Sequence, residues 1–173
     1  MLAHAYATLV AGCDFVSCEG QKNAAPATPF AHRVHDRMTA NRLRELDRFL
    51  SVLLEEVAHL LGGACHDGAG FARTSNSSKK LRLVEAMAGL SSEDHVRLRA
   101  IGRIAARLRH DGPHRHAASF AGDYLLAAGH VPSDQRPGAE GRGRLSPDAI
   151  RSVSGFYRAI GDRLMLYTVH LSG

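Results

Sequence analysis

The chain has 173 residues, of which 45% are hydrophobic and 23% are charged, and its formal net charge is +5. This length gives about one domain with a hydrophobic core of its own, so the composition excludes a chain that is disordered throughout. Tryptophan is absent and aromatic residues are few, so aliphatic residues must build the core, which favours helices over strands. We therefore expect an all-α fold, a single-domain bundle of five or six helices over residues 1–173.

The charge and the cysteine content bear on partners and location. A positive balance favours anionic partners such as RNA, although +5 over this length is also ordinary for a solvated surface. Three cysteines, a small and odd number, argue against a disulfide framework and predict a reducing, cytoplasmic location. No apolar run approaches the length of a membrane-spanning helix, so we expect no membrane association.

The first 38 residues predict an N-terminal extension that carries one short helix. Apolar residues recur at helical spacing over residues 2–16, which predicts that helix. Prolines and a glycine over residues 17–30 predict a loop after it. We expect this extension, residues 1–38, to precede the main bundle.

The clearest helix comes next. Thr39 or Asn41 is a suitable N-cap for it, and Gly62-Gly63 predicts its end. Its apolar residues at helical spacing are Leu43, Leu46, Phe49, Leu50, Leu53, Leu54, Val57, Leu60 and Leu61.

Arginines on this helix are candidate phosphate-binding residues, namely Arg42, Arg44 and Arg48. Glu45 and Asp47 partly neutralise them, so an ordinary exposed helix face is the alternative interpretation.

Three further helices are expected toward the C-terminus, after a short helix that carries Leu81 and Val84. Ser91 or Ser92 caps the first of them, and Gly112-Pro113 should stop it. A second helix covers residues 115–128, and the Pro-, Gly- and Arg-rich residues 130–145 predict a flexible connection. Ser146-Pro147-Asp148 is a strong start for the last helix. Its expected buried residues are Ile150, Val153, Tyr157, Ile160, Leu164 and Tyr167.

One stretch resembles a known family. Residues 78–112 read SKKLRLVEAMAGLSSEDHVRLRAIGRIAARLRHDG. They resemble the HEPN superfamily, particularly its bacterial mannitol-repressor-like members, in which a Lys-anchored short helix and a polar turn precede a long helix ending in Ile-Arg-Asn and then His. The matching residues are Lys80, Leu81, Leu90, Ser91, Leu98, Ile101, Ile104 and His110.

The resemblance implies a function. In that family, Arg and His from paired subunits form a metal-independent ribonuclease site, in which His moves a proton of the ribose 2′-hydroxyl and Arg stabilises charge on the phosphate. Here Ala105-Ala106 stands where active members carry Arg-Asn. We therefore expect a non-catalytic, RNA-binding or regulatory homodimer without a metal or other cofactor. Its partner would be RNA or a protein in a bacterial defence, toxin–antitoxin or regulatory system.

Nearby arginines are candidates to replace the missing one. Arg103 precedes His110 by seven positions, about two turns, so both share a helix face, and Arg107 lies about one turn from His110. Arg109 and His114 form an alternative pair, although the expected helix break separates them. Without the resemblance, Arg and His near a helix C-terminus are explained by their favourable interaction with its dipole.

Other functions compete with this interpretation. A protein-interaction or transcription-regulating bundle without RNA binding is the main alternative. A histidine phosphotransfer protein is the second alternative. In it, His59, in the run Glu56–Ala64, would accept the phosphoryl group, but the lysine expected after this histidine is absent.

Two sets of residues have donor groups for a metal, although a site without metal is expected. The first is His110, His114 and His116, and the second is Cys13, Cys18, Cys65 and His66.

Overall fold

The computed structural model describes residues 1–22, 28–62, 71, 76–110, 117–129 and 145–171. Within these ranges the chain forms six helices and no strand, which confirms the expected all-α bundle. None of the described helices is long and apolar enough to cross a membrane. The helices are α1 (Leu2–Lys22), α2 (Pro29–Leu60), α4 (Ser77–Met87), α5 (Asp94–His110), α6 (Ala117–Ala128) and α7 (Pro147–Leu171).

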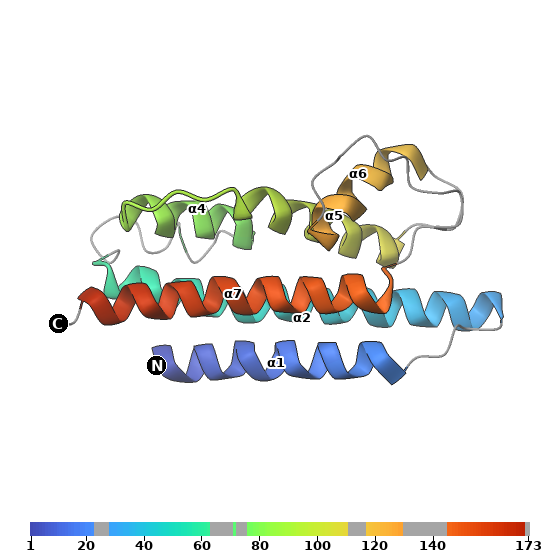
Figure 1. Ribbon diagram of the computed structural model, residues 1–173, viewed down its shortest axis with the longest axis horizontal. Coiled ribbons are helices and arrows are strands. Elements are labelled where there is room, and N and C mark those ends of the chain that lie inside the picture. The colour runs from blue at the N-terminus through green and yellow to red at the C-terminus, as the bar shows by residue number, and fades with distance from the viewer. Residues whose placement is uncertain (23–27, 63–70, 72–75, 111–116, 130–144, 172–173) are drawn as a thin grey trace.

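The longest helix, α2, organises the bundle. The helices α1, α4, α5 and α7 all pack against it. Figure 1 shows α1, α2 and α7 running along the long axis of the molecule, with α4, α5 and α6 on the side opposite α1. A stripe of α2 residues is buried because their spacing of three and four places them on one side of the helix. The most buried are Leu43, Leu46, Leu50, Leu53, Leu54 and Val57.

The start of α2 differs from the expectation. The helix begins at Pro29, after Thr28, whose hydroxyl accepts a hydrogen bond from the Ala31 N–H at 3.1 Å. A threonine cap followed by proline at the first helical position is a favourable helix start. The expected start at Thr39 or Asn41 is therefore wrong, and Thr39 lies buried inside the helix.

The N-terminal region is part of the core rather than an extension. α1 runs to Lys22, beyond the expected end at residue 16, and packs against both α2 and α7. Leu9 is fully buried, and the Tyr6 hydroxyl donates to Asp162 of α7 at 2.6 Å. Residues of α1 therefore belong to the hydrophobic core.

Other expected boundaries are confirmed. The Ser146 hydroxyl accepts a hydrogen bond from the Ala149 N–H at 3.1 Å, so it caps α7 as its sequence predicts. Gly62 adopts a φ of 79° just after α2, in the region that glycine favours. The expected helix over residues 115–128 corresponds to α6, and the connection expected at residues 130–145 lies outside the described residues up to residue 144.

Arg97 joins α5 to the last two helices. Its Nε and Nη2 donate to the Ala127 carbonyl at the end of α6, at 3.1 and 2.8 Å, and Nη2 also donates to the Ser152 hydroxyl of α7 at 2.9 Å. The guanidinium lies 4.3 Å from the centroid of the Phe156 ring. These contacts satisfy a carbonyl that the helix end leaves open, and they hold α5 in place against α6 and α7.

The approach of α1 to α2 is tested by Gly12→Ala. An added Cβ would lie 2.8 Å from two ring carbons of Phe49, so we expect unfolding in urea to show a loss of about 1–3 kcal/mol. The matched control is Gly155→Ala on α7, where a Cβ meets nothing within 4 Å and where we expect a gain of about 0.5–1 kcal/mol. Equal stability of the two variants would contradict the packing described.

Candidate functional site

The packing of α5 on α2 determines which of its residues are accessible. The helix buries its apolar side against α2, so its last turn, with Arg109 and His110, is left exposed beside that helix. The buried residues are Leu98, Ala100, Ile101, Ile104 and Ala105.

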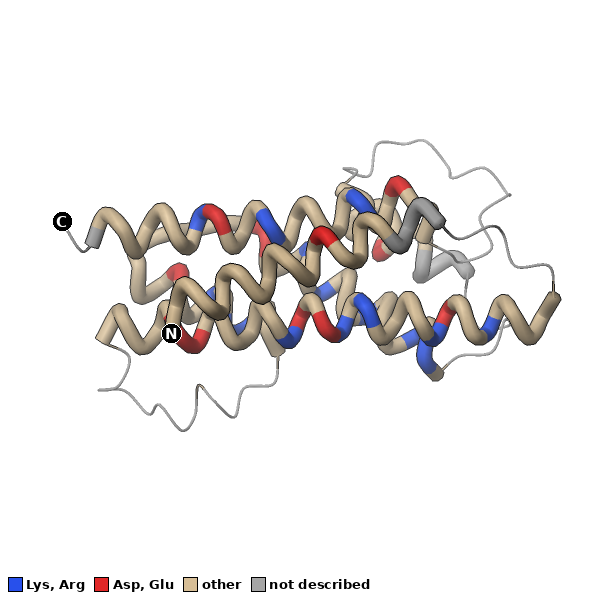
Figure 2. Tube along the Cα trace, turned by 90° about the horizontal axis from the view of Figure 1, so that it is seen from below, with Lys and Arg blue, Asp and Glu red and all other residues tan. Residues whose placement is uncertain are grey.

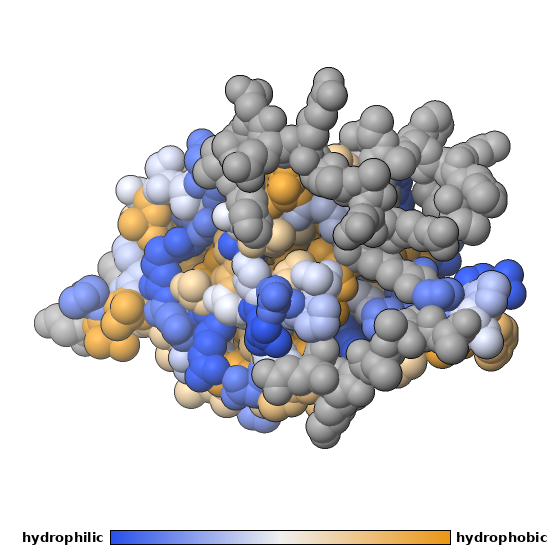
Figure 3. Space-filling view, turned by 45° about the vertical axis from the view of Figure 1, so that its right-hand side comes forward, coloured by the Kyte–Doolittle hydropathy of each residue, from blue (hydrophilic) through white to orange (hydrophobic). Residues whose placement is uncertain are grey.

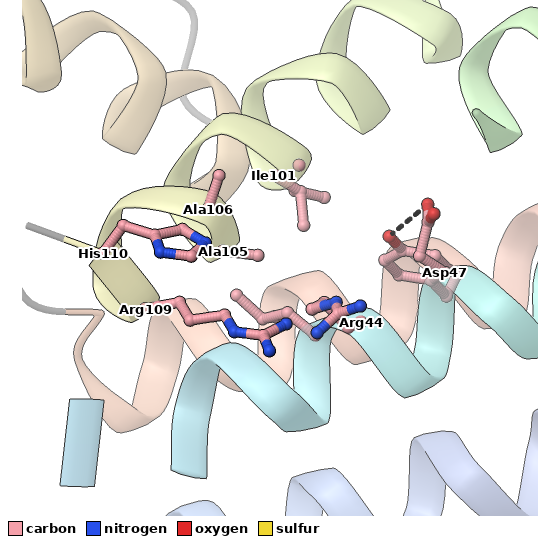
Figure 4. A pocket seen from close by; sticks show the side chains of 10 residues that line it. Arg44, Asp47, Ile101, Ala105, Ala106, Arg109 and His110 are labelled. Atoms are coloured by element: carbon pink, nitrogen blue, oxygen red, sulfur yellow. Dashed lines mark hydrogen bonds between the residues drawn. The ribbon is translucent and has the colours of Figure 1, made fainter. Parts of the chain in front are cut away.

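A pocket of about 330 Å³ lies between these two helices (Figure 4). Ala105 and Ala106 line it, so the position at which the resembled family carries Arg-Asn faces the same pocket as His110. The other lining residues come from three helices: Leu43, Arg44 and Asp47 of α2, Ile101, Gly102 and Arg109 of α5, and Tyr157 of α7.

One end of the pocket is cationic. Figure 4 shows the side chains of Arg44 and Arg109 extending toward one another from α2 and α5, with the His110 ring above them. No ion pair or hydrogen bond joins these three side chains to another described residue. Two neighbouring guanidinium groups without a carboxylate partner repel each other, and an anion between them would relieve that repulsion. The arrangement can therefore bind a phosphate or another anion.

The other end of the pocket carries a carboxylate. Asp47 Oδ1 accepts a hydrogen bond from the Ser77 hydroxyl and a longer one, of 3.4 Å, from the hydroxyl of the fully buried Tyr157. Burial raises the pKa of Asp47 above its usual range, while the hydrogen bonds from Ser77 and Tyr157 and the charge of Lys80 act in the opposite direction. Burial also holds the pKa of Tyr157 well above its ordinary value, so this hydroxyl is a stable donor.

A buried lysine supports the acidic end. Lys80 of α4 is 2% exposed, and its Nζ donates to the Ser51 hydroxyl at 2.8 Å and pairs with Glu55 of α2. A buried ammonium group needs such partners because its desolvation is costly. The same contacts hold the start of α4, and hence Ser77, against α2. The lysine that anchors the resembled motif therefore supports Asp47 through the placement of α4.

Arg103 does not reach the pocket. The seven-residue spacing does place it on the same side of α5 as His110, but its guanidinium pairs with Asp123 of α6, with Nε donating at 2.8 Å. The expected partnership of Arg103 with His110 is replaced by this ion pair, because the carboxylate of α6 lies within its reach. Arg107 also lies outside the pocket lining.

The expected phosphate-binding set is reduced in the same way. Of Arg42, Arg44 and Arg48, only Arg44 lines the pocket. Figure 2 shows basic and acidic residues interspersed along α2, so the helix has no continuous basic stripe in its described length. The three arginines therefore do not form one phosphate-binding surface.

Several other candidates lie apart from the pocket. His59 is exposed in the last turn of α2, where the negative end of the helix dipole disfavours a phosphoryl group. Among the described residues, no three His, Cys, Asp or Glu side chains come together as metal ligands. Of the metal candidates, His114, His116, Cys65 and His66 lie outside the described residues, and so does the Arg109–His114 pair. Cys13 is buried, which raises its pKa to about 11.

Asp47 and Tyr157 are site residues that the sequence alone does not identify. In the sequence, Asp47 is only a charge that offsets the arginines, and Tyr157 is only a core residue. A signal is nevertheless present, because Asp47 follows Leu46 and precedes Leu50 at the edge of a buried stripe. An acid at such a position requires hydrogen-bond donors from neighbouring helices.

Searches against protein-family models, curated proteins and solved structures found no match for this chain.

The raised pKa of Asp47 predicts a pH-dependent stability. The Asp47 carboxyl binds its proton more tightly in the folded state than in the unfolded state. Protonation of Asp47 therefore stabilises the fold fully below the ordinary pKa of 3.8, and this stabilisation is lost as the pH rises through the raised pKa. Asp47→Asn cannot ionise, so its unfolding free energy should improve relative to the parent as the pH rises across that window. Urea unfolding between pH 3 and 7 measures this difference.

The matched control is Glu45→Gln, an exposed acid on the same helix. The unfolding free energy of this variant should not improve relative to the parent as the pH rises. If the difference in unfolding free energy between Asp47→Asn and the parent does not change with pH, burial does not raise the pKa of Asp47 as described.

Proposed function

We propose that this chain is a HEPN-like RNA-associated module that binds RNA phosphates in the pocket between α2 and α5 without cleaving RNA. The observation that carries the proposal is the convergence of Arg44, Arg109 and His110 on one pocket, where no described carboxylate pairs with them. The homodimer and a bacterial regulatory or defence role stay predictions from the resemblance, and the cytoplasmic location stays a prediction from the cysteine content.

Phosphate is the anion that this end of the pocket fits best. A guanidinium group presents a planar fork of N–H donors that matches two phosphate oxygens, and two such groups come from different helices. His110 adds a ring nitrogen that can donate to a third oxygen. The helices hold these groups on a packed scaffold, so the arginine backbones need little ordering when a ligand binds.

The lining argues for binding rather than cleavage. Ala105 and Ala106 present only methyl groups where the resembled family carries a charged and an amide side chain. Arg103, the preferred substitute, pairs with Asp123 and does not line the pocket. Arg44 and Arg109 share the pocket with His110, but neither stands at the position where the resembled family carries the arginine that stabilises the developing charge.

Fluorescence anisotropy with a labelled single-stranded RNA tests the proposal. We expect salt-dependent binding that weakens about tenfold in Arg44→Ala and in Arg109→Ala, because each variant lacks one charge-assisted hydrogen bond to phosphate. The logarithmic salt slope should fall in magnitude by about 0.7 for each arginine that no longer neutralises a phosphate. The control is Arg82→Ala, an exposed arginine on α4 outside the pocket lining, which should bind like the parent.

The same RNA incubated with the protein and EDTA should stay intact. Cleavage that disappears in His110→Ala would contradict the non-catalytic part of the proposal. RNA binding that is unchanged in both pocket variants, or absent in the parent, would contradict the assignment of the pocket.

A second candidate function is protein interaction. Phe30, Val34 and Met38 are 69%, 41% and 47% exposed. Their four-residue spacing puts them on one side of the end of α2 that extends beyond α1 and α7 in Figure 1. On the face that Figure 3 shows, hydrophobic patches are broken up by hydrophilic side chains. Stoichiometric association with a protein, without RNA binding, would favour this alternative.

A further inference from the structure

The pocket has two chemically different ends. Arg109 and His110 lie at one end, Asp47 lies at the other end, and Arg44 lies between them (Figure 4). Figure 4 shows Ile101 above Arg44, so the α5 side of the middle of the pocket is apolar. An anion is attracted to the arginines and repelled by the carboxylate, which gives a bound ligand a fixed direction.

Asp47 has acceptor capacity that its neighbours do not use. Both hydrogen bonds to its carboxylate, from Ser77 and Tyr157, reach Oδ1. No donor among the described residues reaches Oδ2, and Oδ2 is not one of the fully buried polar atoms, so it is accessible from the pocket. An ionised carboxylate offers about four lone-pair sites, so Oδ2 can accept a hydrogen bond from a ligand.

A ribonucleotide combines the two groups that these ends require. It carries a phosphate and, a short distance away, a 2′-hydroxyl that can donate a hydrogen bond, whereas deoxyribose lacks that hydroxyl. The pocket volume of about 330 Å³ is near the lower end of small-molecule sites, which run from roughly 300 to 1,000 Å³. This size suits a single nucleotide rather than a longer segment.

We infer that Asp47 accepts a hydrogen bond from a ribose 2′-hydroxyl and so makes the pocket select RNA over DNA. This inference rests on the proposed phosphate binding and adds a specificity-determining residue to it. The raised pKa of Asp47 fits this role, because a carboxylate that burial leaves under-solvated gains most from an added donor.

Uracil oligomers that differ only at the 2′ position of the sugar test the contribution of the 2′-hydroxyl to binding. Three labelled strands of equal length are compared by anisotropy: oligouridine, oligodeoxyuridine and 2′-fluoro-oligouridine. The base is the same in all three, and the 2′-fluoro strand keeps an RNA-like sugar but cannot donate. We expect the parent to bind oligouridine about tenfold or more tightly than either of the others.

Asp47→Asn tests the residue itself. We expect the preference for oligouridine to fall to about twofold or less, because an amide nitrogen replaces the free acceptor. Binding of oligodeoxyuridine should be kept or improved, because a negative charge is removed. Glu45→Gln is the matched control and should keep the full preference.

The outcomes separate the two claims. Equal binding of all three strands by the parent, with dependence on Arg44 and Arg109, overturns the role of Asp47 and leaves the proposed function standing. A preference that survives in Asp47→Asn also overturns that role. Absence of binding to every strand overturns the proposed function and this inference together. Since the three-strand comparison uses the parent protein, equal binding of the strands overturns the role of Asp47 even if the variant fails to fold.

Discussion

The burial of one leucine stripe on α2 is the constraint on which the rest of the structure depends. Leu43, Leu46, Leu50, Leu53 and Leu54 are all at most 1% exposed, and α1, α4, α5 and α7 pack against the helix that carries them. Each buried leucine contributes about 1.5–3 kcal/mol relative to an exposed one, so this stripe is a major source of the bundle's stability. The pocket lies where α5 packs beside this helix.

Polar groups at the edge of the stripe connect this packing to the site. Asp47 sits beside Leu46 and is held by Ser77 and Tyr157, whereas Lys80 holds α4 through its partners on α2. A charge at such a position is costly unless donors are supplied, so α4 and α7 must be placed correctly before the pocket can form. Folding and the chemistry of the pocket are therefore coupled through these hydrogen bonds.

Much of the fold is predictable, because apolar periodicity and helix caps are local signals. The rule that locates the start of α7 at Ser146-Pro147 also applies to α2 at Thr28-Pro29. The sequence prediction nevertheless starts α2 too late, because the first ten residues bury little and the dense run of apolar residues begins only at Leu43. It ends α1 too early for a similar reason, since the last turns of that helix contain a glycine and polar residues.

The site is only partly predictable. His110 and Arg44 are candidates from the sequence, whereas Arg109 is paired there with a different histidine. Spacing along α5 shows that Arg103 and His110 share a face, but not that a carboxylate on α6 takes up the arginine. Likewise, nothing local shows that Asp47 faces the same pocket as His110, because α2 and α5 meet only in the folded chain. Long-range contacts of this kind decide which charges stay available for a ligand.

The most direct test of the central claim is an NMR titration of the protein with oligouridine that follows the arginine Nε–H signals. We predict that the signals of Arg44 and Arg109 shift together, with the backbone amides of residues 43–47 and 101–110, while those of α4 stay in place. If the oligouridine shifts signals elsewhere on the molecule but not the Nε–H signals of Arg44 and Arg109, this pocket is not the nucleic-acid site.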